Sequence, residues 1–412
     1  MKVGVVGLGY VGLGIAIVLA EQGNEVIGVE IDEGKVEKIR KGIPTMFEPG
    51  IKEHIEKALP NLSVSTNYST LSGARFLYIA VPTPTVNNRI DLSYVERAAL
   101  SIKAASPSST IVIKSTVVPG TAQKITELTG MDVVSNPEFT REGRAIEDTL
   151  HPDRIVIGAG KQKLIDGLKE LWAFTGAPVL ETNNVNAELI KYASNGFLAT
   201  KISFANELAD LCEKIPGCDI EVVARGMGMD KRIGPAFLGA GLGWGGSCFP
   251  KDTMALLAFA GENQVHLNIV SAAIEQNDLR ILHATTLLKK IAGENLSGKR
   301  IAVLGVAFKD DTDDTRSSKS IELINHLAEY GVAVNVYDPI AKYNGKGRRF
   351  DSLSECVEKS DMVVIATEWA GFRSALKGVE KPILDMRRIL DLREYPNIDA
   401  VGLGKESRRT KV

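Results

Sequence analysis

One cysteine, Cys248, lies in an unusual setting for a thiol, the stretch GLGWGGSCFPKDT at residues 241–253. Glycines let a ligand approach the backbone closely, and Lys251 and Asp252 place charged groups near the sulfur. A neighbouring cation favours the thiolate, and a helix that starts near Asp252 would add its N-terminal dipole. The stretch therefore predicts a nucleophilic cysteine.

A glycine pattern near the N-terminus predicts a second kind of site. The residues GLGYVG follow an apolar strand, open a helix and precede another strand. In that context GxGxxG is typical of a dinucleotide-binding turn. Gly7 permits the turn, Gly9 lets the backbone approach a pyrophosphate, and Gly12 lets helix and strand pack closely.

An acidic residue ends the strand that follows the glycine turn. Glu30 at this position would accept hydrogen bonds from ribose hydroxyls and repel a 2′-phosphate, which favours NAD over NADP. Asp32 lies close by and is the rival, although the strand ends better at Glu30.

An NAD site together with a nucleophilic cysteine suggests oxidation to the acid level. An aldehyde is trigonal and must add a nucleophile before it can lose hydride. Thiolate addition gives a thiohemiacetal, oxidation of that gives a thioester, and water then releases an acid.

Three regions must position these groups. The first, 1–184, alternates apolar runs with helical patterns and predicts a mostly parallel Rossmann-like sheet. The second, 185–294, is helical and contains one long helix at 185–215, roughly 45 Å in length. The third, 295–412, returns to strand–helix alternation, so the fold class is α/β with two Rossmann-like domains joined by a helical domain. Strands are expected at 2–7, 25–30, 75–81, 110–114, 132–135, 154–158, 299–308, 332–339, 361–367 and 382–386, and further helices at 10–22, 93–105, 119–128, 219–228, 252–262, 266–292 and 317–330.

Composition narrows the class of protein. The 412 residues carry a net charge of -2, which gives no electrostatic reason to expect nucleic acid or an anionic membrane. No apolar run reaches the ~18 residues of a spanning helix. The four cysteines form no CxxC pair and the five histidines are scattered, so neither a disulfide framework nor a metal site is expected. Cys212 and Cys356 fit buried apolar positions, Cys218 follows Pro-Gly in a turn with no charge arranged around it, and a cytoplasmic setting fits best.

Seven ordered segments resemble the UDP-glucose/GDP-mannose dehydrogenase family over nearly the whole chain. They are VGLGYVGL (6–13), VPTPTVNNRIDLSYV (81–95), IKSTVVPGT (113–121), SNPEFTREG (135–143), KYASNGFLATKISFANE (191–207), RIGPAFLGAGLGWGGSCFPKDT (232–253) and GVAFKDDTDDTRSS (305–318). The resemblance implies oxidation of UDP-glucose by two NAD⁺ and water to UDP-glucuronate. It also implies an N-terminal NAD domain, a central dimerisation domain and a C-terminal domain for the UDP moiety.

The resemblance implies a role for each catalytic residue. Cys248 matches the nucleophile. Lys191 and Asn195, four apart on one helix face, match groups that stabilise oxyanions at sugar C6. Asp252 matches an aspartate that, with the lysine, orients a water or proton acceptor, and Glu138 matches the glutamate that activates water for thioester hydrolysis.

The resemblance also implies binding residues. Cofactor contacts fall on Gly7, Gly9, Tyr10, Val11, Gly12, Glu30, Lys35, Thr83, Thr116, Glu142 and Arg316. Substrate contacts fall on Arg232, Phe237, Gly245, Lys309 and Arg387, with Arg388 as a rival to the last. Arg232 would come from the neighbouring subunit, which implies a homodimer or higher oligomer.

Some of these assignments have structural alternatives. Glu142, one helical turn after Glu138, would instead belong to a solvated helix face. Lys309 and Arg316, in a run with four aspartates, would form a salt-bridged surface loop. Trp244 stands where phenylalanine is usual, which would reshape the sugar end of the pocket.

Only a few residues near Cys248 distinguish between the possible substrates of the family. Ser247 and Lys251 argue against the UDP-N-acetylmannosamine branch, and Phe249 favours UDP-glucose over GDP-mannose, while other UDP-N-acetylhexosamines stay an alternative. Two other functions compete: a single-step β-hydroxyacid-type dehydrogenase that does not need Cys248, and a nucleotide-sugar-binding protein without catalysis.

Overall fold

The computed structural model describes residues 1–395 and 397–404, and it contains two compact units. The first contains Met1–Ser194 and Met254–Glu262. The second contains Asn195–Thr253 and the described residues from Asn263 onward. The polar tail ESRRTKV, which we expected to be frayed, lies outside the described residues.

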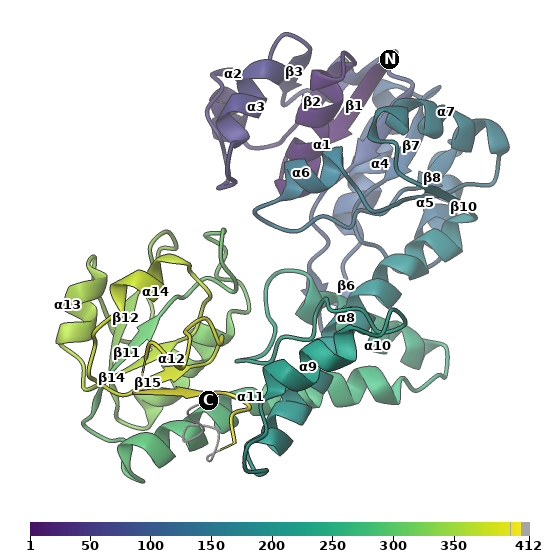
Figure 1. Ribbon diagram of the computed structural model, residues 1–412. Helices are drawn as coiled ribbons and strands as arrows, with labels where there is room; N and C mark the ends of the chain where they lie inside the picture. Colours follow the sequence, from purple (N-terminus) through teal and green to yellow (C-terminus); the bar gives the residue numbers. More distant parts are fainter. Residues whose placement is uncertain (396, 405–412) are drawn as a thin grey trace. The chain divides into compact units, whose positions relative to one another are not determined.

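The first unit is built on an eight-stranded sheet with the order β10-β9-β8-β7-β4-β1-β2-β3 (Figure 1). All neighbouring strands are parallel except β8 and β9. The strands are β1 (Lys2–Val6), β2 (Glu25–Val29), β3 (Leu62–Ser65), β4 (Phe76–Ile79), β7 (Thr110–Ile113), β8 (Val133–Ser135), β9 (Ile155–Gly158) and β10 (Val179–Thr182), with a separate antiparallel pair β5 (Thr85–Val86) and β6 (Arg89–Ile90).

This sheet is buried on both faces. In β4, Phe76 and Tyr78 belong to one apolar cluster, and Leu77 and Ile79 belong to another. A strand covered on both sides needs a continuous apolar run, which explains why FLYI shows no alternation. The helices of this unit are α1 (Tyr10–Glu21), α2 (Glu33–Arg40), α3 (Ile51–Ala58), α4 (Ser93–Ala105), α5 (Thr121–Thr129), α6 (Ala145–Leu150) and α7 (Gln162–Trp172).

The second unit contains a six-stranded, fully parallel sheet with the order β13-β12-β11-β14-β15-β16 (Figure 1). Its strands are β11 (Arg300–Leu304), β12 (Ala333–Tyr337), β13 (Arg348–Arg349), β14 (Met362–Ile365), β15 (Ile383–Asp385) and β16 (Ile398–Ala400). Its helices are α9 (Ile220–Gly228), α11 (Asn268–Ala292), α12 (Lys319–Glu329), α13 (Leu353–Glu358) and α14 (Gly371–Ala375).

Two helices contribute residues to both units. The long helix α8 (Asn184–Cys212) has 29 residues, and the unit boundary falls between Ser194 and Asn195. Helix α10 (Phe249–Glu262) changes unit after Thr253. The predicted α/β class with two parallel sheets, a helical middle and a long helix is therefore confirmed, while the three domain boundaries remain a prediction.

The two sheets repeat one local device. In the first unit the N–H of Gly7 donates to the carbonyl of Val29, and the carboxylate of Glu30 accepts from the N–H of Leu8. In the second unit the N–H of Gly305 donates to the carbonyl of Tyr337, and Asp338 accepts from the backbone of Val306 and Ala307. Each acid thus ties the end of the second strand to the turn after the first.

Several local expectations differ from the structure. Strands β3, β10 and β16 were not anticipated, because each is short and β10 is half exposed. Helix α10 begins at Phe249 rather than near Asp252, since Pro250 is tolerated in a first helical turn. No helix in the described part of the chain has the length and apolar character needed to cross a membrane.

Candidate functional site

The glycine turn of the first unit has the geometry that its sequence predicted. Gly7 has φ +87°, and a Cβ there would lie 2.7 Å from the carbonyl oxygen of Ala80. A Cβ on Gly12 would lie 1.8 Å from the carbonyl oxygen of Gly7, so helix α1 can pack here only with glycine. Gly9 precedes α1 and has no atom within 4 Å of its Cβ position, which leaves open space for a ligand at the helix N-terminus.

The acid beside this turn is Glu30, as predicted. Its side chain is buried and accepts backbone N–H groups from Leu8 at 3.0 Å, Ile31 at 2.9 Å and Asp32 at 3.3 Å. A carboxylate has about four acceptor sites, so capacity for a ribose hydroxyl remains. Asp32 caps α2 by accepting the N–H of Lys35 at 3.1 Å, which assigns the rival carboxylate to helix capping.

The other predicted cofactor residues of this unit lie in its loops and first helical turns. Tyr10 and Val11 open α1, Lys35 lies in the first turn of α2, Thr83 follows β4, and Thr116 follows β7. Glu142 lies in a non-helical segment between β8 and α6, so the expectation of a helical turn from Glu138 to Glu142 was wrong. Arg141 donates to Asp148, which closes this segment onto α6. The remaining predicted cofactor residue, Arg316, belongs to the second unit and donates to Asp314.

A buried ion pair joins two of the predicted catalytic residues. Lys191 Nζ on α8 lies 2.6 Å from Glu138 Oε1, and both side chains are below a tenth exposed. The second oxygen of Glu138 accepts the N–H and the hydroxyl of Thr140, each at 2.7 Å. Burial alone raises the pKa of Glu138, but the charge of Lys191 and the hydrogen bonds from Lys191 and Thr140 together hold that pKa below its usual value.

A second buried lysine stands beside this pair and was missed by sequence reasoning. Lys114 Nζ donates to Asn136 Oδ1 at 3.1 Å and to the carbonyl of Pro137. Burial lowers the pKa of Lys114 to about 8, Glu138 opposes that shift, and Lys191 adds to it. The only signal in the sequence was its position in the segment IKSTVVPGT, directly after the apolar strand β7.

Glu188 organises the loops around this lysine pair. It lies three residues before Lys191 on α8. Its carboxylate accepts the N–H groups of Gly120 at 2.7 Å and Ala122 at 2.8 Å. It also accepts the hydroxyl of Ser135 at 3.1 Å. These bonds hold the start of α5 and the end of β8 against α8, next to a small cavity that Thr116 and Lys191 also line.

In the second unit, Cys248 lies immediately before the first residue of α10. Its carbonyl accepts the N–H of Asp252 at 2.8 Å, which closes the first turn of the helix. The thiol is half-buried and lies 3.5 Å from the hydroxyl of Ser247. The helix N-terminus presents partial positive charge at this position, which favours a thiolate.

Asp252 is almost fully buried and both of its oxygens are occupied. Oδ2 accepts the amide of Asn195 at 2.6 Å, and Oδ1 accepts Lys251 Nζ at 2.6 Å. The second contact gives Lys251 a different function from activating the thiol: it neutralises the buried aspartate. Asn195 and Asp252 therefore come together from segments 57 residues apart, whereas the expected partner of Asp252 was Lys191.

The glycines before Cys248 are required by the protein's own packing, whereas ligand approach was the expected reason. A Cβ on Gly245 would lie 2.1 Å from the carbonyl oxygen of Ser317. On Gly246, which has φ +84°, it would lie 2.7 Å from the ring of Phe308. The glycine-rich segment before Cys248 therefore packs closely against other segments of the same unit.

Trp244 is part of this packing. Its backbone N–H donates to Asn277 at 2.7 Å, and its indole N–H donates to Ser203 at 2.9 Å. Its ring makes an edge contact with Phe249 at a centroid distance of 6.2 Å. The residue that we expected to reshape the pocket is therefore a buried anchor between α8, α11 and the cysteine segment.

The predicted substrate arginine Arg387 and its rival Arg388 both line a cavity of about 500 Å³ in the second unit. Arg387 donates to the carbonyl of Ala366 at 2.7 Å, and Arg388 donates to the carbonyl of Val401 and to Asp219. The other lining residues are Ile220, Glu221, Ala224, Arg225, Gly228, Met229, Pro235, Leu238, Gly239 and Ala240.

The remaining predicted substrate residues do not line this cavity. Phe237 has φ +63°, a strained value for a side chain of its size, and its ring packs against Phe249. Lys309 donates to the carbonyl of Asp310. Arg232 is 89% exposed and is held by Asp230 at 2.6 Å, so it projects from the surface of this chain.

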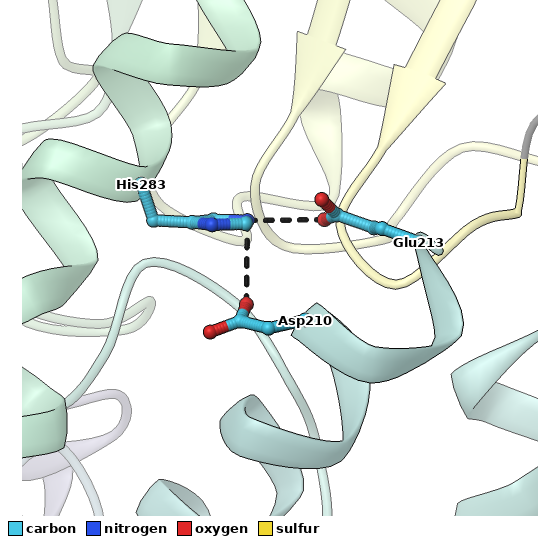
Figure 2. A group of neighbouring side chains, drawn as sticks. All are labelled: Asp210, Glu213 and His283. Carbon is cyan, nitrogen blue, oxygen red and sulfur yellow. Dashed lines mark hydrogen bonds and ion pairs between the residues drawn. The ribbon is translucent and has the colours of Figure 1, made fainter. Parts of the chain in front are cut away.

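One group in the described residues has metal-ligand character, although none was expected. Figure 2 shows Asp210 and Glu213 near the end of α8 facing His283 of α11. His283 Nε2 lies 3.0 Å from Glu213 and 3.4 Å from Asp210. The fully buried Arg280 lies 2.5 Å from the same Asp210 oxygen, and a guanidinium there opposes a dication. We therefore interpret the group as a structural anchor.

Comparison with known proteins identifies the family of the chain. The UDP-glucose/GDP-mannose dehydrogenase family models match in order: the NAD binding domain at 1–175, the central domain at 185–279 and the UDP binding domain at 302–394. UDP-glucose 6-dehydrogenase YwqF of Bacillus subtilis (strain 168) is 40% identical, covering 98% of this chain and 96% of its own length. UDP-glucose 6-dehydrogenase AglM of Haloferax volcanii is 40% identical, covering 96% and 98% respectively.

Two solved structures have the same fold over nearly their full length. A UDP-glucose dehydrogenase from the hyperthermophilic archaeon Pyrobaculum islandicum has a TM-score of 0.91 at 37% identity, covering 98% of both chains. A UDP-D-ManNAc dehydrogenase from Pyrococcus horikoshii has a TM-score of 0.88 at 29% identity, covering 98% of this chain and 100% of that one.

The glycine turn, the open N-terminus of α1 and the carboxylate of Glu30 fit a dinucleotide, and NAD is the cofactor. These features define an NAD-dependent oxidoreductase. With all three domains matched in order, the chain belongs to the UDP-glucose/GDP-mannose dehydrogenase family.

Proposed function

We propose that this enzyme oxidises UDP-glucose to UDP-glucuronate in two NAD-dependent steps, with the intermediate held on Cys248. One observation supports the covalent step above all others: Cys248 directly precedes helix α10, whose first turn carries Lys251 and the buried Asp252, to which Asn195 of α8 donates. When bound between the glycine turn and Glu30, NAD supplies a two-electron acceptor.

The first step needs a proton acceptor and a group that stabilises negative charge on oxygen. Asn195 and Lys251 donate hydrogen bonds to the carboxylate of Asp252 and hold it in place. Asp252 orients the water or group that takes the proton of the sugar C6 hydroxyl. Lys191 and Asn195 lie on one stripe of α8 and stabilise the developing alkoxide.

The second step uses the thiol. The Cys248 thiolate adds to the C6 aldehyde and forms a thiohemiacetal, whose oxidation leaves a thioester. Glu138 then takes a proton from the water that hydrolyses this thioester. Glu138 accepts hydrogen bonds from Lys191 and Thr140 in the structure, and in this proposal Lys191 turns from Glu138 toward the substrate oxyanion as the reaction proceeds.

The nucleotide part fits the second unit. The cavity that Arg387 and Arg388 line offers two guanidinium groups for a diphosphate and apolar walls for a base. The names of the relatives favour UDP-glucose, and one structural neighbour is a UDP-D-ManNAc dehydrogenase, so UDP-N-acetylhexosamines and GDP-mannose are the competing substrates.

A second copy of the chain completes the site in this proposal. Arg232 extends into solvent, and Phe197, Phe204 and Leu211 on α8 are each about half exposed or more at seven-residue spacing. An apolar stripe at that spacing packs against a partner helix, and Arg232 then reaches the substrate of the other subunit.

The test is NADH formation across UDP-glucose, UDP-galactose, UDP-N-acetylhexosamines and GDP-mannose. We expect UDP-glucose to give two NADH per substrate and a carboxylate product. Cys248→Ser should lose turnover to the acid, whereas Cys356→Ala, which changes a buried cysteine of the second-unit core, should retain it. One NADH per substrate with normal turnover in Cys248→Ser would instead support a single-step dehydrogenase, and ligand-induced stabilisation without any NADH would support a binding protein.

A further inference from the structure

We propose that Cys212 and Cys218 form a reversible disulfide in the second unit, independent of the proposed function. No disulfide joins the two cysteines in the structure, and their sulfur atoms lie 2.6 Å apart. A disulfide has an S–S distance of about 2.05 Å, so bond formation needs only a small movement of one side chain. The pair has no CxxC spacing, which is why the sequence did not reveal it.

The backbone holds the two cysteines in place whether or not they are bonded. Cys212 ends α8, and a tight turn returns the chain through Ile215, whose carbonyl accepts the N–H of Cys218 at 3.1 Å. Gly217 has φ +77°, which makes this return possible. Asp219 then caps α9 by accepting the N–H of Glu221.

The anchor of Figure 2 fixes the other side of the pair. Asp210 and Glu213 flank Cys212 in sequence and both contact His283 on α11. Arg280 of α11 adds a further ion pair to Asp210. The last turn of α8 therefore cannot easily rotate Cys212 away from its neighbour.

The surroundings of the pair permit oxidation from one side. Cys212 is buried, while Cys218 is half-buried at the end of an exposed turn. The expectation that no charge surrounds Cys218 was wrong, because Arg388 donates to the adjacent Asp219 at 2.7 Å. Burial and the neighbouring thiol raise the pKa of Cys212 to about 12, so Cys218 is the first nucleophile.

The oxidant is a small-molecule disulfide of the glutathione type. The Cys218 thiolate attacks one sulfur of the oxidant, breaks its S–S bond and releases one thiol. Cys212 gives up its proton, its sulfur attacks Cys218 and releases the second thiol. Two protein thiols are thus oxidised to one disulfide while one oxidant molecule is reduced to two thiols, and excess thiol reverses the reaction.

The crosslink would stabilise the platform on which the end of the described chain docks. The N–H of Gly404 donates to the carbonyl of Cys218, and the N–H of Ile220 donates to the carbonyl of Gly402. Glu213 accepts the N–H of Gly402 at 3.1 Å. Residues on both sides of the disulfide therefore hold the C-terminal segment.

Oxidised glutathione added to the purified full-length protein tests the proposal. Thiols titrated after denaturation should fall from four to two and return to four with excess dithiothreitol. Lys214 lies between the two cysteines, so trypsin separates them, and mass spectrometry should find their peptides joined. Four remaining thiols, or joined peptides that contain Cys248 or Cys356, would overturn the proposal.

Thermal unfolding supplies a second measurement. Oxidation should raise the Tm of the second unit by on the order of 5 °C, because the crosslink restricts the unfolded chain. Cys218→Ser should abolish this rise, whereas Cys356→Ala should keep it. An equal rise in Cys218→Ser would contradict the assignment, and if that variant fails to fold, the peptide map of the unmodified chain decides.

Discussion

Replacing Lys191 by methionine leaves the buried carboxylate of Glu138 without its counter-ion. The two charges lie 2.6 Å apart and neither side chain is more than a tenth exposed. Removing one partner of such a pair costs about 3–5 kcal/mol. Glu138 keeps two hydrogen bonds from Thr140, and Lys114 loses a repelling neighbour, so we expect the lower end, about 3 kcal/mol. For a unit of this size, the Tm of the first unit should fall by roughly 6–12 °C.

The pH dependence of this loss has a defined sign. In the unmodified enzyme the pKa of Glu138 is lowered, so the pair stabilises the fold above the ordinary carboxyl pKa and is lost as pH falls through the folded value. Without Lys191, burial dominates and raises the pKa of Glu138. The folded variant is then most stable when the Glu138 carboxyl is protonated. Lys191→Met should therefore lose more stability, relative to the unmodified enzyme, at pH 8 than at pH 5.

Differential scanning calorimetry at several pH values measures both effects. The double variant Lys191→Met with Glu138→Gln should recover most of the lost Tm, because it removes both charges. Lys169→Met is the matched control, since Lys169 makes an ion pair of the same 2.6 Å length with Glu181 at the surface. It should leave Tm nearly unchanged. A Tm of Lys191→Met within error of the unmodified enzyme, or a loss that does not change with pH, would refute the reasoning.

Three further predictions concern single residues. Gly12→Ala places a Cβ 1.8 Å from the carbonyl oxygen of Gly7, so NAD affinity measured by fluorescence titration should fall at least tenfold; an unchanged Kd would contradict the packing role. Trp244→Phe removes the indole hydrogen bond to Ser203 and should cost about 1 kcal/mol in urea unfolding, with KM for the nucleotide sugar little changed; a large change in KM would place this ring in the substrate pocket. Lys114 has its pKa lowered to about 8, so stability relative to Lys114→Met should rise between pH 8 and pH 10, where the unfolded state binds more protons; a flat difference would contradict the burial effect.

Local features of the site were predictable because their geometry depends on neighbouring residues. Gly7 and Gly12 meet across one turn, and Glu30 ends the next strand at hydrogen-bond distance from that turn. The nucleophile setting of Cys248 followed from the residues next to it, although the helix begins three residues earlier than expected.

Other features were not predictable because they join distant segments. Lys114 donates to Asn136, which lies 22 residues away in the sequence. Trp244 donates to Ser203, which lies 41 residues away. Asp252 was expected to act with Lys191. Nothing in the sequence showed that Lys251 would donate to one of the Asp252 carboxylate oxygens. Only packing decides which of several polar groups meets a buried charge.

The amino-acid sequence by itself determined the α/β class and the dinucleotide turn, because strand and helix periods and tight turns are local properties. The tertiary structure alone decided how these residues are paired. It joined Glu138 to Lys191, Asp252 to Asn195, and Cys212 to Cys218. Burial sets the strength of each pairing, since a charge or thiol removed from water takes its properties from the few groups that the fold places against it.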